Sequence, residues 1–102
     1  MIKVFHDPIN HDPAEYVNWL DAHQDNGYLI DRNNQGGSWG GQFHRANCPL
    51  MNQIVNRNGA LQHARYKACS TDRDGLLAWG QYVHQGINAP QPHVNGPHAC
   101  NP

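Results

Sequence analysis

The sequence has few of the residues that mark secreted, membrane or highly charged proteins. It contains three cysteines, which cannot all pair in disulfides, and no apolar run approaches the length of a membrane span. Nothing at the N-terminus resembles a signal peptide, because residues 1–5 lead directly into His6, Asp7 and Pro8. We therefore expect a cytoplasmic protein with reduced thiols.

Apolar residues are also scarce. They make up 38% of the 102 residues, whereas glycine, proline, asparagine, glutamine and histidine are abundant. A chain of this length forms one domain with a modest core, and such a core benefits from a metal cross-link. We expect a single zinc-binding domain spanning residues 1–102.

The net charge of −1 argues against a nucleic-acid-binding protein, but the charges are unevenly distributed. Residues 1–31 hold six carboxylates against Lys3, a net charge of −5, whereas residues 32–71 hold five basic residues and no carboxylate. The second region could present a basic face. Alternatively, the two regions neutralise each other across an interface.

Local patterns predict an α+β fold, with a β-hairpin and one or two further short strands packed with two to three helices. Strands are expected at residues 1–6, 28–32, 39–43 and 64–70, with a turn at 33–38 closing the hairpin. Asp12, Pro13 and Glu15 form a helix start with a capping box, and this helix ends at Gly27. Pro49 and Thr71 are expected to begin two further helices, and residues 87–96 an extended loop.

Two His/Cys pairs separated by about fifty residues predict a split metal site. His44 and Cys48 supply the first pair, and His98 and Cys100 the second. Cys69 is an alternative fourth ligand, although its neighbours favour a buried free thiol. The other histidines lack ligand spacing and are expected at the surface or at helix ends: His6, His11, His23, His63, His84 and His93.

The run from His44 to Pro49, with the terminal Pro-x-x-Cys-x-Pro, resembles the Ada-type zinc domain. The chain is also similar to a group of small uncharacterised bacterial proteins with a His-Arg-Ala-x-Cys motif, a later Tyr/Lys/Cys segment, here Tyr66-Lys67-Ala68-Cys69, and a helix bearing tryptophan. The resemblance implies a treble-clef-like zinc fold associated with nucleic acids. It does not carry over methyl-acceptor chemistry, because His44 stands where the Ada domain has its acceptor cysteine.

These features give a main hypothesis and two alternatives. The main one is a non-catalytic zinc module that contacts DNA or RNA through Arg45, Arg57, Arg65 and Lys67. One alternative is a metal-dependent nuclease with His44 as general base and Asn56, Asn58 or His63 near the ion. The other is a protein-interaction adaptor that uses the acidic first third.

Overall fold

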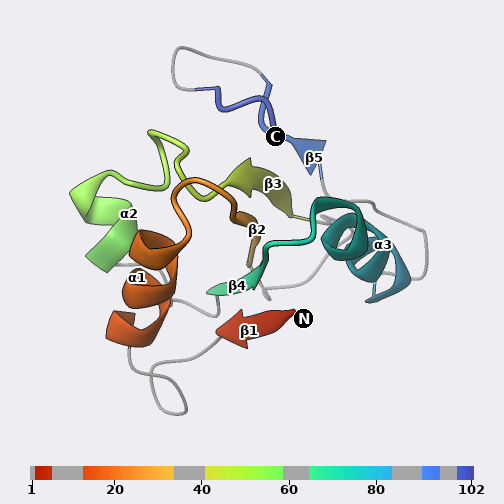
Figure 1. The fold of residues 1–102 in the computed structure, drawn as a ribbon, viewed down its shortest axis with the longest axis horizontal. Coiled ribbons are helices and arrows are strands. Elements are labelled where there is room, and N and C mark those ends of the chain that lie inside the picture. Colours follow the sequence, from red (N-terminus) through yellow and green to blue (C-terminus); the bar gives the residue numbers. More distant parts are fainter. Residues whose placement is uncertain (1, 6–12, 34–40, 59–64, 84–90, 95–98) are drawn as a thin grey trace.

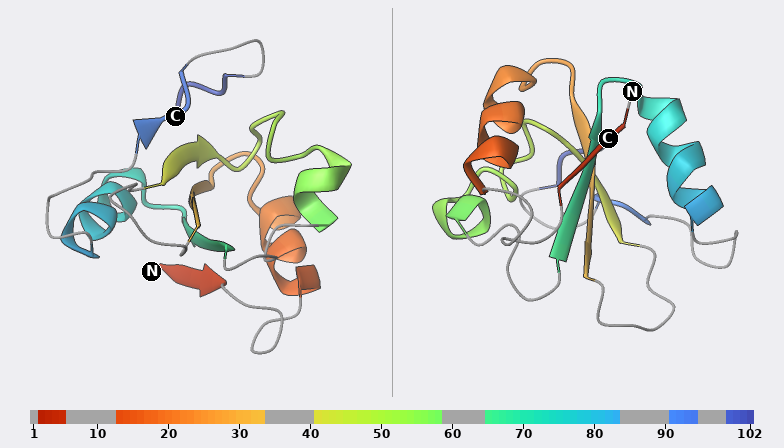
Figure 2. Two further views of the ribbon diagram at one scale, coloured as in Figure 1. Left: turned by 180° about the vertical axis from the view of Figure 1, so that it is seen from behind. Right: turned by 90° about the horizontal axis from the view of Figure 1, so that it is seen from below.

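The computed structural model describes residues 2–5, 13–33, 41–58, 65–83, 91–94 and 99–102, which form a sheet with helices on both faces. The strands are β1 (Lys3–Phe5), β2 (Tyr28–Asn33), β3 (Gln42–Arg45), β4 (Arg65–Ser70) and β5 (Gln91–Pro92). The helices are α1 (Pro13–Ala22), α2 (Ile54–Asn58) and α3 (Arg73–Val83). Helices α1 and α2 cover one face of the sheet, and α3 covers the other (Figures 1 and 2).

The strand order is β1-β4-β2-β3-β5, which places β2 at the centre of the sheet. Strand β2 pairs antiparallel with β3 and β4, and β1 pairs antiparallel with β4. Strand β5 is parallel to β3. The predicted hairpin between β2 and β3 is therefore confirmed, but the sheet has one strand more than expected, because part of the predicted loop at 87–96 forms β5.

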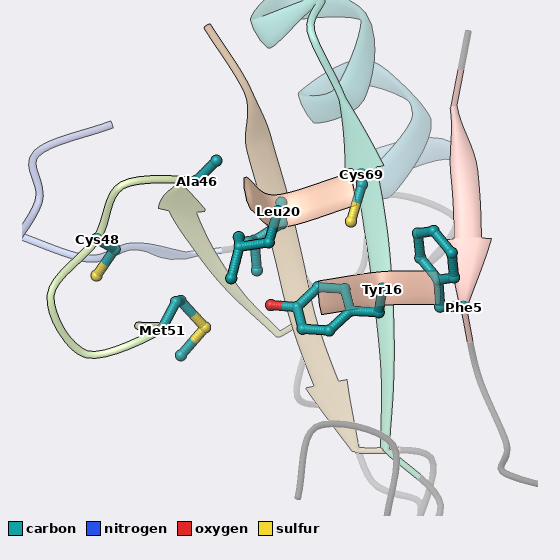
Figure 3. Packing of buried hydrophobic residues seen from close by; sticks show 8 residues of the cluster. Phe5, Tyr16, Leu20, Ala46, Cys48, Met51 and Cys69 are labelled. Carbon is teal, nitrogen blue, oxygen red and sulfur yellow. The ribbon is translucent and has the colours of Figure 1, made fainter. Parts of the chain in front are cut away.

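Alternation along the strands builds two cores, one on each face of the sheet. Leu29 and Cys69 are opposite each other and point toward α1, where they pack with Tyr16 and Leu20 (Figure 3). Three strand residues with the opposite orientation, Ile30, Phe43 and Ala68, point toward α3. They pack with its buried residue Leu76. A strand with apolar residues on both faces is typical of a sheet covered on both sides.

Side-chain hydrogen bonds set the start of α3. The backbone N–H of Gly75 donates to Asp72 Oδ1 at 3.1 Å, and that of Leu76 donates to the Asp72 carbonyl at 3.0 Å. Asp72 is therefore the N-cap, one residue after the predicted cap, Thr71. The predicted capping residue of α1, Asp12, lies outside the described residues.

Helix α2 is shorter than predicted. Residues 49–53, expected to open the helix at Pro49, form turns, and the helix begins at Ile54. The described residues thus confirm an α+β fold, while the treble-clef likeness stays a prediction. No helix in this part of the chain has the length and apolar character needed to cross a membrane.

Candidate metal centre

Four side chains converge beside strand β3. His44 lies in β3, Cys48 in the loop that follows it, His93 directly after β5, and Cys100 near the end of the chain. One ligand atom from each residue lies within 4.8 Å of the other three. His44 and Cys48 have no exposed surface, His93 is 7% exposed, and Cys100 is partly buried.

The sulfur–nitrogen separations are close to those of a tetrahedral site. The Cys48 Sγ lies 3.5 Å from His44 Nδ1 and 3.4 Å from His93 Nδ1. The Cys100 Sγ lies 4.0 Å and 3.8 Å from the same two nitrogens. Zinc bonds of about 2.3 Å to sulfur and 2.0–2.1 Å to nitrogen, at tetrahedral angles, separate sulfur from nitrogen by about 3.6 Å. The four residues therefore fit a zinc ion with little rearrangement.

The hairpin places the first two ligands. His44 is opposite Leu29, so its ring points to the α1 side of the sheet. Immediately after β3, the chain turns: the Ala46 N–H donates to the Gly27 carbonyl at 2.8 Å, and the Cys48 N–H donates to the Arg45 carbonyl at 3.0 Å. This turn brings Cys48 back toward the His44 ring.

Asn52 fixes the loop that carries Cys48. Its side-chain amide donates to the Cys48 carbonyl at 2.8 Å and to the Ala46 carbonyl at 2.9 Å. Its Oδ1 accepts from Gln24 at 3.0 Å and from Arg57 at 3.2 Å. Asn52 and Gln24 were not predicted from the sequence, because an amide that binds loop carbonyls has no characteristic spacing.

Strand β5 and the C-terminal residues place the other two ligands. The His93 N–H donates to the Phe43 carbonyl at 3.0 Å, and the Asn101 N–H donates to the His93 carbonyl at 3.1 Å. Asn101 has a φ of 50°, a left-handed conformation that asparagine tolerates better than most residues. His93 and Cys100 are thereby held on the same side of β3 as His44.

Arg45 joins the two halves of the site. Its backbone N–H donates to the Cys100 Sγ at 3.3 Å. Its Nε donates to the carbonyls of Cys100 at 3.1 Å and Asn101 at 3.2 Å. N–H donors to a ligating sulfur stabilise the thiolate and orient it, as supporting groups around metal sites commonly do.

Burial affects the protonation of two ligands, His44 and Cys100, in the metal-free chain. It lowers the pKa of His44 to about 4, so the imidazole is neutral and able to ligate at physiological pH. It raises the pKa of the Cys100 thiol to about 11, and the Arg45 N–H partly opposes that rise. Metal binding must therefore displace a proton from Cys100.

The structure unites three of the four predicted ligands, His44, Cys48 and Cys100. His98 lies outside the described residues. The other histidine of the cluster is His93, which was expected at the surface; this expectation is wrong, because its pairing beside β3 buries it. The only signal in the sequence was a histidine seven residues before Cys100, and that spacing is not distinctive.

Cys69 belongs to the apolar core and not to the ligand cluster. It is a free, fully buried thiol that packs with Leu29 and Tyr16 on the α1 side of the sheet. Desolvation raises its pKa well above the ordinary range. This position does not support Cys69 as the fourth ligand. It agrees with the interpretation of Cys69 as a buried free thiol.

The predicted nucleic-acid contacts are largely occupied by other groups. The prediction that Lys67 contacts phosphate is wrong, because its side chain is 3% exposed and its Nζ pairs with Asp31 at 2.7 Å. Arg57 pairs with Asp21 at 2.9 Å. Both pairs join the acidic first third to the basic middle, as the neutralisation alternative predicts. Arg45 is exposed, but its side chain donates a hydrogen bond to the backbone carbonyl of Cys100. For Arg65, in β4, the structure describes only the backbone.

The residues of the nuclease alternative do not gather around an open site. His44 has no exposed surface, so it is not accessible to a substrate as a general base. The Asn56 amide donates to the Leu50 carbonyl at 2.7 Å. The Asn58 side chain and His63 are outside the described part of the structure.

No protein-family model matches the chain, and neither a curated protein nor a solved structure shows significant similarity to it. The ligand set and its geometry are therefore the basis for a functional proposal.

Proposed function

We propose that this chain is a small zinc-binding module in which a His2Cys2 site has a structural role. The observation that carries the proposal is the convergence of His44, Cys48, His93 and Cys100, whose ligand atoms lie within 4.8 Å of one another. Two thiolates and two imidazoles in a tetrahedron are a common ligand set for structural zinc.

The number and burial of the ligands support a structural role over a catalytic one. Catalytic zinc sites usually keep one position open for water or substrate, whereas structural sites use four protein ligands. Here four side chains complete the set, and three of them are buried. Among the described residues, the cluster of possible ligands contains no carboxylate.

The test is native mass spectrometry with metal analysis of the reduced protein. The wild type is expected to bind one equivalent of zinc. Cys48→Ser and His93→Ala are each expected to lose it, because each removes one of the four ligands. Cys69→Ser is the matched control, since it changes a buried thiol outside the cluster and should keep the zinc.

A parallel variant, His98→Ala, decides between the two histidines. Retention of zinc in His98→Ala and loss in His93→Ala is the expected pattern. The opposite pattern would return His98 to the site. Absence of zinc from the wild type, or its loss in Cys69→Ser, would contradict the proposal.

Contact with DNA or RNA stays a prediction from the charge distribution, as does a protein partner for the acidic first third. The experiment for the first is fluorescence anisotropy with labelled single- and double-stranded oligonucleotides at low and high salt. Phosphate contacts make affinity fall steeply with salt. No binding at low salt would remove this prediction. Pull-down with and without nuclease treatment would then test for a protein partner.

A further inference from the structure

Strand β5 is attached to the sheet by very few contacts. It is two residues long, Gln91 and Pro92, and both residues are exposed. Its pairing with β3 involves two residue pairs, Gln42 with Gln91 and Phe43 with Pro92, and Pro92 has no N–H to donate. At the ends of this short ladder, the Gln91 N–H donates to the Gly41 carbonyl and the His93 N–H to the Phe43 carbonyl, each at 3.0 Å. So short a ladder offsets little of the entropy that ordering the segment costs.

Apolar burial adds little at this edge. Val94, the residue after the ligand His93, is 51% exposed. Cys100 packs against the core on the α1 side but is only partly buried. In residues 91–94 and 99–102, the buried side chain is that of His93, which is itself a ligand.

The rest of the sheet has its own cores. Strand β2 is paired on both sides, and its residues Leu29 and Ile30 pack into separate clusters on the two faces. Of the four ligands, Cys48 belongs to the α1-side hydrophobic core and Cys100 packs against it, and the α3-side hydrophobic core contains none. This part of the fold does not need the metal to bury its apolar residues.

We propose that the metal acts as a latch, which holds β5 and residues 99–102 on the β3 edge when bound and frees them when removed. The inference rests on the proposed zinc site and adds its regulation: metal occupancy controls one edge of the sheet and leaves the remaining fold intact. Opening the latch frees the carbonyl of Phe43 in β3 and that of Gly41, the residue before β3. It also removes the contact between the Arg45 N–H and the Cys100 Sγ.

Arg45 couples the latch to metal affinity without being a ligand. Its Nε binds the carbonyls of Cys100 and Asn101, so the side chain stabilises the closed segment. Coupling is reciprocal: a group that favours closure also strengthens metal binding, because only the closed state brings all four ligands together.

Hydrogen exchange of zinc-loaded and chelator-treated protein, read by NMR under reducing conditions, tests the latch. Removal of zinc should accelerate exchange at least about tenfold at His93, Asn101 and Arg45, whose N–H groups donate within the latch. Leu29 and Ala68, in the central strands, should keep their protection. Acceleration throughout β2 and β4 would mean global unfolding and would overturn the latch, as would unchanged exchange at the three latch amides.

A second measurement avoids the ligands altogether. Zinc affinity measured by competition with a chelating dye should fall about five- to tenfold in Arg45→Ala, since the charge-assisted hydrogen bond that the Nε–H shares between two carbonyls is lost. Arg45→Lys should recover part of the affinity. Lys3→Ala, an exposed change on the opposite edge of the sheet, is the control and should bind as the wild type does.

The outcomes separate the two proposals. Failure of the wild type to bind zinc removes the proposed function and the latch together. Zinc binding that is unaffected by Arg45→Ala, in a variant with an unchanged circular dichroism spectrum, removes the latch and leaves the zinc site.

Discussion

The two outer strands of the sheet are held in place by different physical means. At one edge, β1 pairs with β4 through three residues, and Phe5 is completely buried. The Phe5 ring packs edge-on against Tyr16 of α1, with 5.8 Å between ring centroids. At the other edge, β5 is exposed, and its neighbour His93 is buried because it joins a cluster of ligands.

The two edges differ in the kind of side chain that joins them to the rest of the fold. Strand β1 has a buried aromatic side chain, whose packing does not involve the ligand cluster. Strand β5 has no buried aromatic side chain, and under the latch proposal its position depends on zinc bound by the neighbouring ligands.

Phe5→Ala breaks the apolar edge. It should lower the free energy of unfolding by about 3–5 kcal/mol, because it removes a fully buried aromatic ring. Urea denaturation followed by circular dichroism measures the loss, and Lys3→Ala on the same strand is the control. The loss should be equally large in chelator-treated protein, and a loss that depends on zinc would contradict the separation of the two edges.

Lys67→Met removes the ion pair between Lys67 and Asp31, next to β1. Lys67 stands in register with Phe5 and Asp31, and its removal leaves a mostly buried carboxylate uncompensated. We expect a loss of about 3 kcal/mol in the free energy of unfolding. The double variant Asp31→Leu/Lys67→Met should recover most of it, and additive losses would show that the two residues are not coupled.

Zinc removal tests the other edge. With free zinc at about a hundred times the dissociation constant, the native state should gain about 2.7 kcal/mol over the chelated protein. Calorimetry at several zinc concentrations measures this gain as a rise in Tm. The gain should shrink as the pH falls, because protons then compete with zinc for the thiolates. His93→Ala is expected to show no gain, and a gain equal to that of the wild type would contradict the ligand set.

Asn52→Ala loosens the loop that carries Cys48. It removes the bonds to the carbonyls of Ala46 and Cys48, and should cost about 1–2 kcal/mol of stability and about tenfold in zinc affinity. Asn47→Ala, an exposed change in the same loop, is the matched control. Equal effects of the two variants on zinc affinity would show that Asn52 does not position Cys48.

The smallest effect concerns the exposed pair of Asp21 and Arg57. The hydrogen bond from Arg57 holds the pKa of the Asp21 carboxyl below its ordinary value. The pair therefore stabilises the fold above the ordinary pKa of the carboxyl, and this contribution is lost as the pH falls through the lowered value. An NMR titration should show the pKa of Asp21 returning to its ordinary value in Arg57→Ala. No change would mean that the pair does not persist in solution.

The sequence predicted most of what local patterns determine. The hairpin that positions His44, and the helices that contribute Tyr16 and Leu76 to the cores, follow from strand alternation and helical periodicity. Thr71 was one residue away from the true cap because Thr71 and Asp72 can both cap a helix, and only the hydrogen bonds of Asp72 decide between them.

The second half of the site was not predictable in the same way. His93 reaches His44 because β5 pairs with β3 across about fifty residues, and a two-residue strand containing Pro92 leaves no periodic signal. Lys67 was expected on a basic surface because its charge is visible in the sequence, whereas its burial depends on Asp31 in a neighbouring strand. Both errors arise from contacts between distant segments.

X-ray absorption spectroscopy of the zinc-loaded protein identifies the atoms that bind the metal. We expect two sulfur ligands at about 2.3 Å and two imidazole nitrogens at about 2.0–2.1 Å, with no oxygen ligand. A spectrum with three sulfurs would bring Cys69 into the site. One with a water oxygen in place of a side chain would contradict a closed structural centre.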